Sequence, residues 1–289
     1  MSSVRPRRSV LYMPGANARA LDKARTLPAD ALILDLEDAV SPDSKELARN
    51  QIAQAVTTGG YGYRELILRT NGLETPWGLD DLKALAPLGA DAILLPKVED
   101  PATILKAAAL LDDYGAPAKT TLWAMMETPL GILRAAEIAG ASKRLTCFVM
   151  GTSDLTKDLH SRHTPMRLPM LTSLGLCLLA GRAYGLTILD GVYLDLKDEA
   201  GFEQSCVQGL ELGFDGKTLI HPSQVEPANK VFAPSEGEIA WSRKIIEAFA
   251  AAEAEGKGVV LVDGKLIENL HVDNAKRVVA LADAIAARG

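Results

Sequence analysis

The stretch ALILDLED, residues 31–38, is a short apolar run that ends in acidic residues. Such a run, with no regular alternation of polar residues, is typical of a strand buried on both faces of a parallel sheet. Similar runs occur at residues 9–13, 65–70, 92–97, 121–126, 145–150, 187–192 and 217–221. Segments between them carry apolar residues at helical spacing, for example Leu79, Leu82 and Leu85. Eight strand–helix units within 289 residues predict a (β/α)8 TIM barrel.

An open, doubly wound sheet is the alternative for alternating strands and helices. Many such sheets carry a Gly-x-Gly-x-x-Gly turn after the first strand, whereas residues 14–17 read PGAN here. Strand number and chain length therefore favour the barrel. After residue 222 the pattern changes to a helix near 236–254, an apolar run at 259–267 and a last helix near 272–287. We expect a barrel domain at residues 1–224 and a small C-terminal extension at residues 225–289.

Composition and charge exclude several classes of function. Hydrophobic residues make up 48% of the chain and charged residues 24%, as in globular enzymes. A net charge of -6 argues against nonspecific binding to nucleic acid or anionic membranes. The apolar run at 9–13 is too short for a signal peptide, and no run approaches the roughly 18 residues of a membrane span. We therefore expect a cytoplasmic protein with no nucleic-acid or membrane partner.

Polar side chains gather where the expected strands end. These strand ends read DLED (35–38), RTN (69–71), PKVE (96–99), ETP (127–129) and GTSD (151–154). Chemistry in TIM barrels occurs at this edge. Carboxylates that converge on one cavity repel each other unless they are protonated, paired or bridged by a cation, and hard oxygen ligands select Mg²⁺. Zinc is not expected, since His221 is the only His or Cys at these ends.

Glu127 and Asp154 are the expected metal ligands. Thr128 and Pro129 are typical of an N-cap and a first helical residue, which leaves the Glu127 carboxylate at the strand exit. The alternative is a helix-start charge favoured by the helix dipole. Asp154 has its own alternative role as the N-cap of the next helix. Its pairing with Glu127 on a neighbouring strand adds weight to the metal interpretation.

Arg69 closes the apolar run at 66–68 and is expected to place its guanidinium in the barrel mouth. Forked hydrogen bonds from a guanidinium suit a substrate carboxylate or carbonyl oxygen. The alternative is an ion pair with Glu37 or Asp38, and the two roles are compatible.

Several motifs together are highly specific: RSVLYMPG (8–15), LDLEDAV (34–40), RTN (69–71), LPKVE (95–99), ETP (127–129), DGVY (190–193), GFDGK (213–217) and IHPSQ (220–224). With them the chain resembles the citrate lyase beta subunit and malyl-CoA or citramalyl-CoA lyase family, within the HpcH/HpaI aldolase–citrate lyase superfamily. The resemblance spans nearly the whole chain. It implies a homotrimeric TIM barrel, Mg²⁺ held by Glu127 and Asp154, and substrate contact by Arg69.

The resemblance also implies coenzyme A contacts at Tyr12, Arg19, Lys23, Thr218 and Leu219, the last two with weaker support. Arg19 and Lys23 lie four residues apart on the expected first helix, so they would present one basic face to the CoA phosphates. The alternative is an ordinary solvated helix face.

Two departures from the family pattern concern the site. Many members have an acidic residue before the metal-binding Asp, where this chain has Ser153. The C-terminal family motif usually ends in an Asp, the catalytic base, which reaches the site from a neighbouring subunit's lid. Here the motif reads DGKLIE (263–268), so Glu268 stands at that position. Its carboxylate is one methylene longer, and the alternative is an exposed Glu at the start of a helix.

We therefore expect a Mg²⁺-dependent carbon–carbon lyase that cleaves or forms a 3-hydroxyacyl-CoA such as malyl-CoA or citramalyl-CoA. Arg69 would stabilise the developing oxyanion, and Glu268 would remove the α-proton of acetyl-CoA in the condensing direction. The partners would be an acyl-CoA and a 2-oxoacid such as glyoxylate or pyruvate. Two alternatives stay open: a thioesterase on the same scaffold that releases malate or a relative, and a citrate lyase beta subunit acting on an acyl-carrier-protein thioester.

Overall fold

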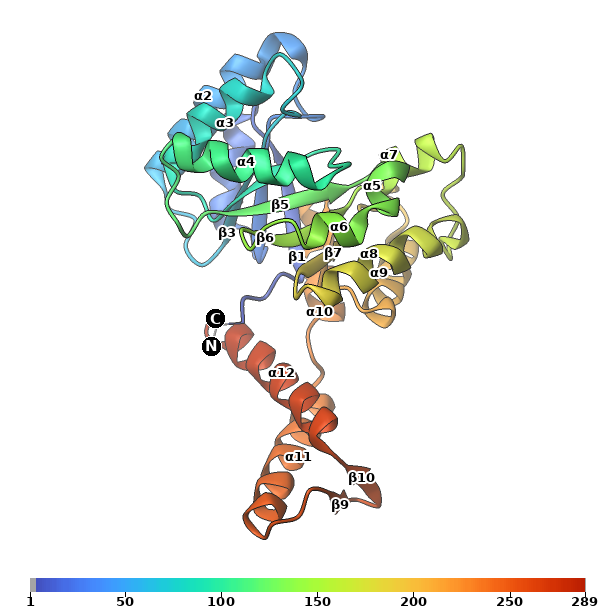
Figure 1. The fold of residues 1–289 in the computed structure, drawn as a ribbon. Helices are drawn as coiled ribbons and strands as arrows, with labels where there is room; N and C mark the ends of the chain where they lie inside the picture. The colour runs from blue at the N-terminus through green and yellow to red at the C-terminus, as the bar shows by residue number, and fades with distance from the viewer. Residues whose placement is uncertain (1–3, 289) are drawn as a thin grey trace. The chain divides into compact units, whose positions relative to one another are not determined.

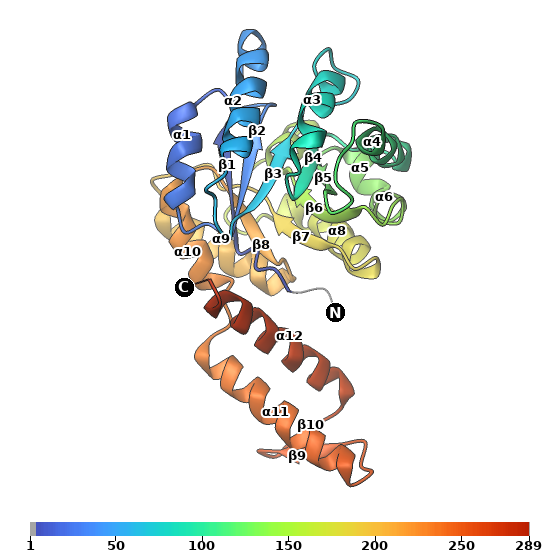
Figure 2. The same cartoon turned by 90° about the vertical axis from the view of Figure 1, so that its left-hand side faces the viewer.

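The computed structural model of the protein describes residues 4–288. Eight parallel strands form a closed barrel in chain order (Figure 1 and Figure 2). Strand β1 completes it by pairing with both β2 and β8. The strands are β1 (Ser9–Pro14), β2 (Ala31–Asp35), β3 (Glu65–Arg69), β4 (Ala92–Leu95), β5 (Thr121–Met126), β6 (Leu145–Met150), β7 (Thr187–Asp190) and β8 (Gly216–Leu219). The predicted (β/α)8 barrel is confirmed.

Helices surround the barrel strands (Figure 2). They are α1 (Ala18–Lys23), α2 (Lys45–Thr58), α3 (Gly78–Leu85), α4 (Pro101–Asp113), α5 (Pro129–Leu133), α6 (Ala135–Ala139), α7 (Thr152–Asp158), α8 (Leu171–Ala183), α9 (Glu199–Leu212) and α10 (Val225–Val231). Short 3-10 helices are η1 (Ala24–Thr26), η2 (Pro42–Ser44), η3 (Ala86–Leu88), η4 (Leu168–Met170) and η5 (Pro222–Gln224).

Apolar side chains fill the inside of the barrel. The interior cluster comprises Val10, Ala31, Ile33, Ile67, Ala92, Leu94, Trp123, Met125, Cys147, Val149 and Leu189, with Tyr12 packed against it. Bulky residues of this kind fill TIM-barrel interiors in layers, so the barrel is not a pore. Chemistry is therefore confined to the edge where the strands end.

The chain divides into two compact units, of which the barrel unit is Arg7–Lys230. The other begins at Val231, includes the residues before Arg7, and contains α11 (Glu236–Ala254), β9 (Val260–Val262), β10 (Lys265–Ile267) and α12 (Asn269–Ala286). The expected apolar run at 259–267 is an antiparallel hairpin, whose turn at Asp263 and Gly264 has positive φ at both residues. The domain boundary expected after residue 224 stays a prediction.

Within residues 4–288, no helix has both the length and the apolar character needed to cross a membrane. Cys147, Cys177 and Cys206 are free and buried in the helices and strands of the barrel unit.

Candidate active site

Side chains from several strand ends meet in one cavity at the mouth of the barrel. The cavity has a volume of about 350 Å³ and is lined by Tyr12, Asp35, Arg69, Glu127 and Asp154, among others. Five segments that are distant in sequence therefore contribute to one site. The structure thus brings together Arg69 and both expected metal ligands.

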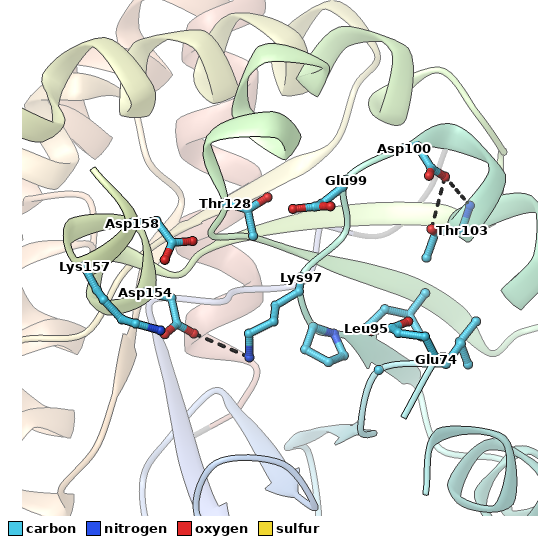
Figure 3. Close-up of a pocket in the computed structure, with 13 residues that line it drawn as sticks. Glu74, Leu95, Lys97, Glu99, Asp100, Thr103, Thr128, Asp154, Lys157 and Asp158 are labelled. Atoms are coloured by element: carbon cyan, nitrogen blue, oxygen red, sulfur yellow. Dashed lines mark hydrogen bonds and ion pairs between the residues drawn. The ribbon is translucent and has the colours of Figure 1, made fainter. Parts of the chain in front are cut away.

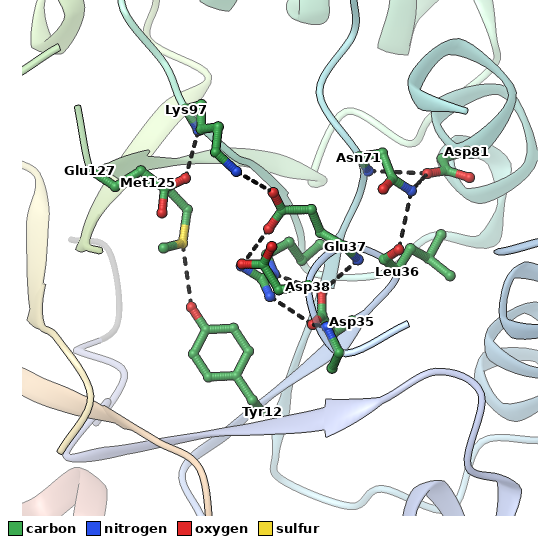
Figure 4. A network of polar contacts seen from close by, with 12 residues as sticks. Tyr12, Asp35, Leu36, Glu37, Asp38, Asn71, Asp81, Lys97, Met125 and Glu127 are labelled. Atoms are coloured by element: carbon green, nitrogen blue, oxygen red, sulfur yellow. Dashed lines mark hydrogen bonds and ion pairs between the residues drawn. The ribbon is translucent and has the colours of Figure 1, made fainter. Parts of the chain in front are cut away.

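Arg69 ends β3, and acids hold its guanidinium. Nε and Nη2 donate to the two oxygens of Asp35, both at 2.6 Å. Nη1 lies 2.7 Å from Glu37 Oε2 and 3.4 Å from Asp38 Oδ2. The alternative ion pairs with Glu37 and Asp38 are thus present, together with a forked pair to Asp35. Figure 4 shows Asp35, Glu37 and Asp38 close to one another. The Asp38 side chain is 62% exposed and makes the longest of these contacts with Arg69, so it is the partner that a ligand replaces most easily.

Glu127 follows β5 directly and is only 2% exposed. Thr128 is the N-cap of α5 and accepts the backbone N–H of Gly131, with Pro129 at the first helical position, as predicted. Burial raises the pKa of Glu127 to about 7, although the backbone N–H of Lys97, which donates to Oε1 at 2.8 Å, opposes the rise. A cation that binds this carboxylate would stabilise the charge that burial disfavours.

Asp154 is the third residue of α7, whose N-cap is Gly151. The suggestion that Asp154 caps this helix is therefore wrong, because the helix begins two residues earlier. Gly151 also has a steric role: a Cβ there would lie 2.3 Å from the Glu127 Cβ and 2.4 Å from its Oε2. A glycine at this point lets the chain after β6 pass close to Glu127.

Lys97 connects three of the carboxylates. Its Nζ donates to Glu37 Oε1 at 2.8 Å and lies 3.7 Å from Asp154 Oδ2, while its backbone N–H binds Glu127. Figure 3 shows the contact with Asp154 at the edge of an adjoining cavity of about 510 Å³. The backbone of Lys97 has φ 48°, a left-handed conformation that costs about 1–3 kcal/mol and is concentrated at functional sites. The sequence pattern assigned Lys97 no role.

The side chains present fit a hard divalent cation. Among residues 4–288 no group of three or more His, Cys, Asp or Glu side chains is arranged to hold a metal. Glu127 and Asp154 offer carboxylate oxygens instead, and Mg²⁺ is commonly held by one or two carboxylates with the remaining positions left to water and substrate. An ammonium group already lies beside Asp154, which indicates that this position accommodates positive charge.

The expected CoA-binding residues occupy different environments. Arg69 Cζ lies 4.9 Å from the centre of the Tyr12 ring, and Tyr12 Oη donates to Met125 Sδ at 3.3 Å. Thr218 lines the mouth cavity and donates to the Asp190 carbonyl at 3.1 Å. Leu219 is fully buried, so its side chain is not at the surface of the mouth. Arg19 and Lys23 are exposed on α1.

Glu268 belongs to the unit that begins at Val231, whereas the residues that line the mouth cavity all belong to the barrel unit. It is exposed and is the N-cap of α12, where its carbonyl accepts the backbone N–H of His271 at 2.9 Å and His271 Nδ1 accepts the Glu268 N–H at 3.1 Å. The helix-start role considered for Glu268 is therefore present in the structure.

The sequence matches the family model described as HpcH/HpaI aldolase/citrate lyase over residues 8–222. It is 55% identical over 282 residues to a (3S)-malyl-CoA thioesterase of Cereibacter sphaeroides, covering 98% of this chain and 96% of that protein. It is 38% identical to the citrate lyase subunit beta of Escherichia coli, covering 96% and 94%. The solved structure of CitE from Mycobacterium tuberculosis in complex with magnesium, acetoacetate and coenzyme A is similar at a TM-score of 0.76 and 28% identity, covering 95% and 97%.

Proposed function

The chain belongs to the HpcH/HpaI aldolase/citrate lyase family, and from this premise we propose that it is a Mg²⁺-dependent thioesterase acting on (3S)-malyl-CoA. The observation that carries this proposal is 55% identity to a (3S)-malyl-CoA thioesterase across 98% of the chain. The thioesterase was the alternative to the lyase expected from the sequence. The relatives move the balance toward hydrolysis, and the carboxylates of the mouth support metal-assisted chemistry on an acyl-CoA.

Glu127 and Asp154 would hold Mg²⁺, which supplies Lewis-acid polarisation of substrate oxygens when it is bound. Magnesium in the similar CitE structure supports this choice of metal. Arg69 would bind the free carboxylate of the malyl group, which replaces the weakly held Asp38. Asp35 keeps the guanidinium in position through its forked contact, so the substrate meets a group that is already oriented.

Hydrolysis requires a base for the attacking water. The water oxygen bonds to the thioester carbon, the carbon–sulfur bond breaks, and the sulfur leaves as the CoA thiolate, which takes up a proton. We propose that Glu268 of a second copy of the chain accepts the proton from this water. The hairpin before it exposes Leu261 and Leu266, at 70% and 53%, and the first turn of α12 exposes Leu270, at 64%, as expected for a surface that closes over a ligand.

Glu268→Gln is expected to lower kcat by about 10²-fold or more because the amide accepts no proton from water. Helix α12 keeps an N-cap with a side-chain oxygen, so the melting temperature should change little. Rates and melting curves are measured side by side, with Glu255→Gln as a matched exposed control. Full activity in Glu268→Gln would remove this residue from the mechanism.

Mg²⁺ affinity is expected to fall as the pH is lowered through about 7. Burial raises the pKa of Glu127 to about 7, so below that pH the protonated carboxyl must lose its proton before it binds the metal. The apparent Kd should therefore rise about tenfold per pH unit below 7 and level off above it. Titration calorimetry in buffers of different ionisation enthalpy measures both the affinity and the released proton. A flat profile from pH 5.5 to 8 would contradict this assignment.

The homotrimer implied by the family resemblance is also proposed for this chain. Exposed leucines on the barrel unit support an interface: Leu133 of α5, Leu168 of η4 and Leu179 of α8 are 77%, 69% and 73% exposed. An oligomer would also supply Glu268 from another copy. The proposed CoA contacts of Tyr12, Arg19, Lys23, Thr218 and Leu219, and the cytoplasmic location, stay predictions.

The second candidate is the lyase expected from the sequence, which the relationship to the citrate lyase subunit beta favours. Product analysis separates the two. Purified protein is incubated with Mg²⁺ and malyl-CoA, with an EDTA control, and all CoA species and acids are resolved by mass. Free CoA with malate supports the thioesterase. Acetyl-CoA with glyoxylate supports the lyase. If malyl-CoA is neither hydrolysed nor cleaved, the result would favour a subunit that acts on a carrier protein.

A further inference from the structure

A separate cavity of about 270 Å³ lies beside the segment that connects α7 to α8. It shares Thr152, Val192 and Leu194 with the lining of the mouth cavity, so the two cavities adjoin. Its other walls include Pro165 and Met170, which make much of the lining apolar. None of the functions proposed above uses this space.

Arg167 lies in the wall of this cavity and reaches the end of β7. Its Nη1 donates to both oxygens of Asp190, at 2.6 and 2.8 Å, and its Nε donates to Gln208 Oε1 at 2.6 Å. Its backbone is left-handed, with φ 51°. Across residues 4–288, Nη2 of Arg167 is one of a few buried side-chain atoms without a hydrogen-bond partner. A buried donor of this kind is costly unless a ligand or water satisfies it.

The charges around Arg167 do not balance. Lys217 Nζ also donates to Asp190, at 2.8 Å, so one fully buried carboxylate faces two cations. The side chains of Lys217 and Arg167 are only 1% and 12% exposed. Asp195 lines the same cavity, but it is exposed and accepts the backbone N–H of Lys197, so water screens its charge. The buried cluster therefore has an excess of positive charge.

Thr164 supplies a second polar group to the cavity. Its Oγ1 is buried and, in the described part of the chain, has no hydrogen-bond partner. Its carbonyl accepts the backbone N–H of Arg167 at 2.9 Å, which keeps the two residues in one turn. A guanidinium and a hydroxyl in a cavity that also has apolar walls fit an oxyanion attached to a short hydrocarbon group.

We propose that this cavity binds a short carboxylic acid, with the carboxylate held by Arg167 and Thr164 and the hydrocarbon part against Met170 and Val192. Binding of the acid requires neither Mg²⁺ nor a CoA ester, so this proposal does not depend on the proposed thioesterase activity. The acid comes either from hydrolysis at the adjoining mouth or from solution.

The test is ligand-observed NMR with propionate as the probe and propionamide as its uncharged analogue. Metal-free and CoA-free protein is used throughout. Wild type should bind propionate saturably. Its affinity for propionamide should be lower by about tenfold or more. Thr164→Val, which leaves the contacts with Asp190 intact, should weaken propionate binding about tenfold. Thr57→Val, a matched change on the exposed face of α2, should leave it unchanged.

Arg167→Met should abolish propionate binding, and circular dichroism checks that each variant is folded. Equal binding of propionamide, unchanged binding in Thr164→Val, or no saturable binding to wild type would overturn the proposal. Loss of binding in Arg69→Met with unchanged binding in Thr164→Val would place propionate in the mouth and overturn it too. Displacement of propionate by malate assigns the site to the acid that the proposed hydrolysis releases, and no displacement assigns it to another short acid.

Discussion

Glu127→Gln is expected to lower malyl-CoA turnover about a thousandfold, because removing a metal ligand forfeits several kcal/mol of transition-state stabilisation. The amide keeps the size of the side chain and can still accept the Lys97 N–H, so folding should be preserved. Calorimetry should show that Mg²⁺ binding is weakened in parallel with the rate. Removing a buried carboxyl whose pKa is raised should leave the metal-free protein as stable as wild type or slightly more so at pH 8.

The matched control for this variant is Glu99→Gln. Glu99 lines the adjoining cavity that contains Lys97, and it does not line the mouth. Its substitution should change turnover less than threefold, an order-of-magnitude expectation for a side chain without contact with the reacting atoms. If Glu127→Gln retained full Mg²⁺ binding and turnover, the metal site would have to lie elsewhere.

Asp190→Asn is expected to destabilise the barrel by about 3–5 kcal/mol, because it leaves two buried cations without their carboxylate. Burial alone would raise the pKa of Asp190, but the positive charges of Lys217 and Arg167 hold this pKa below its ordinary value. The stability that this pair of contacts provides is therefore present above the ordinary pKa and is lost as the pH falls through the lowered one. Urea unfolding at pH 7 measures the first effect, and a series extended to about pH 2, below the ordinary Asp pKa of about 3.9, measures the second.

Asp215→Asn provides the comparison for Asp190→Asn. Asp215 pairs with Arg182, and the two side chains are 30% and 47% exposed, so its loss should cost about 1 kcal/mol or less. The double variant Asp190→Asn/Lys217→Met should recover part of the lost stability, since one uncompensated charge is removed. Equal losses in Asp190→Asn and Asp215→Asn would contradict the account of the buried cluster.

Local sequence patterns predicted much of the fold. The strands at 121–126 and 145–150 and the helix at 236–254 were predicted to the residue, because each is a strongly patterned segment with clear boundaries. The strand expected at 187–192 ends at Asp190, where the side chain accepts the next backbone N–H and the chain leaves the sheet. The last helix begins at Asn269 instead of near 272 because Glu268 caps it.

The site could be predicted where a residue's role depends on its place at a strand end. The family and the barrel are confirmed, and Arg69, Glu127 and Asp154 line one cavity, while their roles in binding metal and substrate stay predictions. Side-chain contacts between segments that are distant in the chain could not be predicted from the positions of residues at strand ends. The Nζ of Lys97 and the guanidinium of Arg167 find their partners 60 and 23 residues away, and only the folded chain determines those pairings.

The central claim is that water attacks the thioester carbon of malyl-CoA at the Mg²⁺-dependent mouth. The most direct test is turnover of malyl-CoA in ¹⁸O-labelled water, with mass analysis of the acid and CoA products in wild type and Glu127→Gln. The account predicts malate with one solvent oxygen in the new carboxylate, equimolar free CoA, neither product in EDTA, and about a thousandfold slower formation of both in the variant. Acetyl-CoA with glyoxylate and no labelled malate would contradict it and establish carbon–carbon cleavage instead.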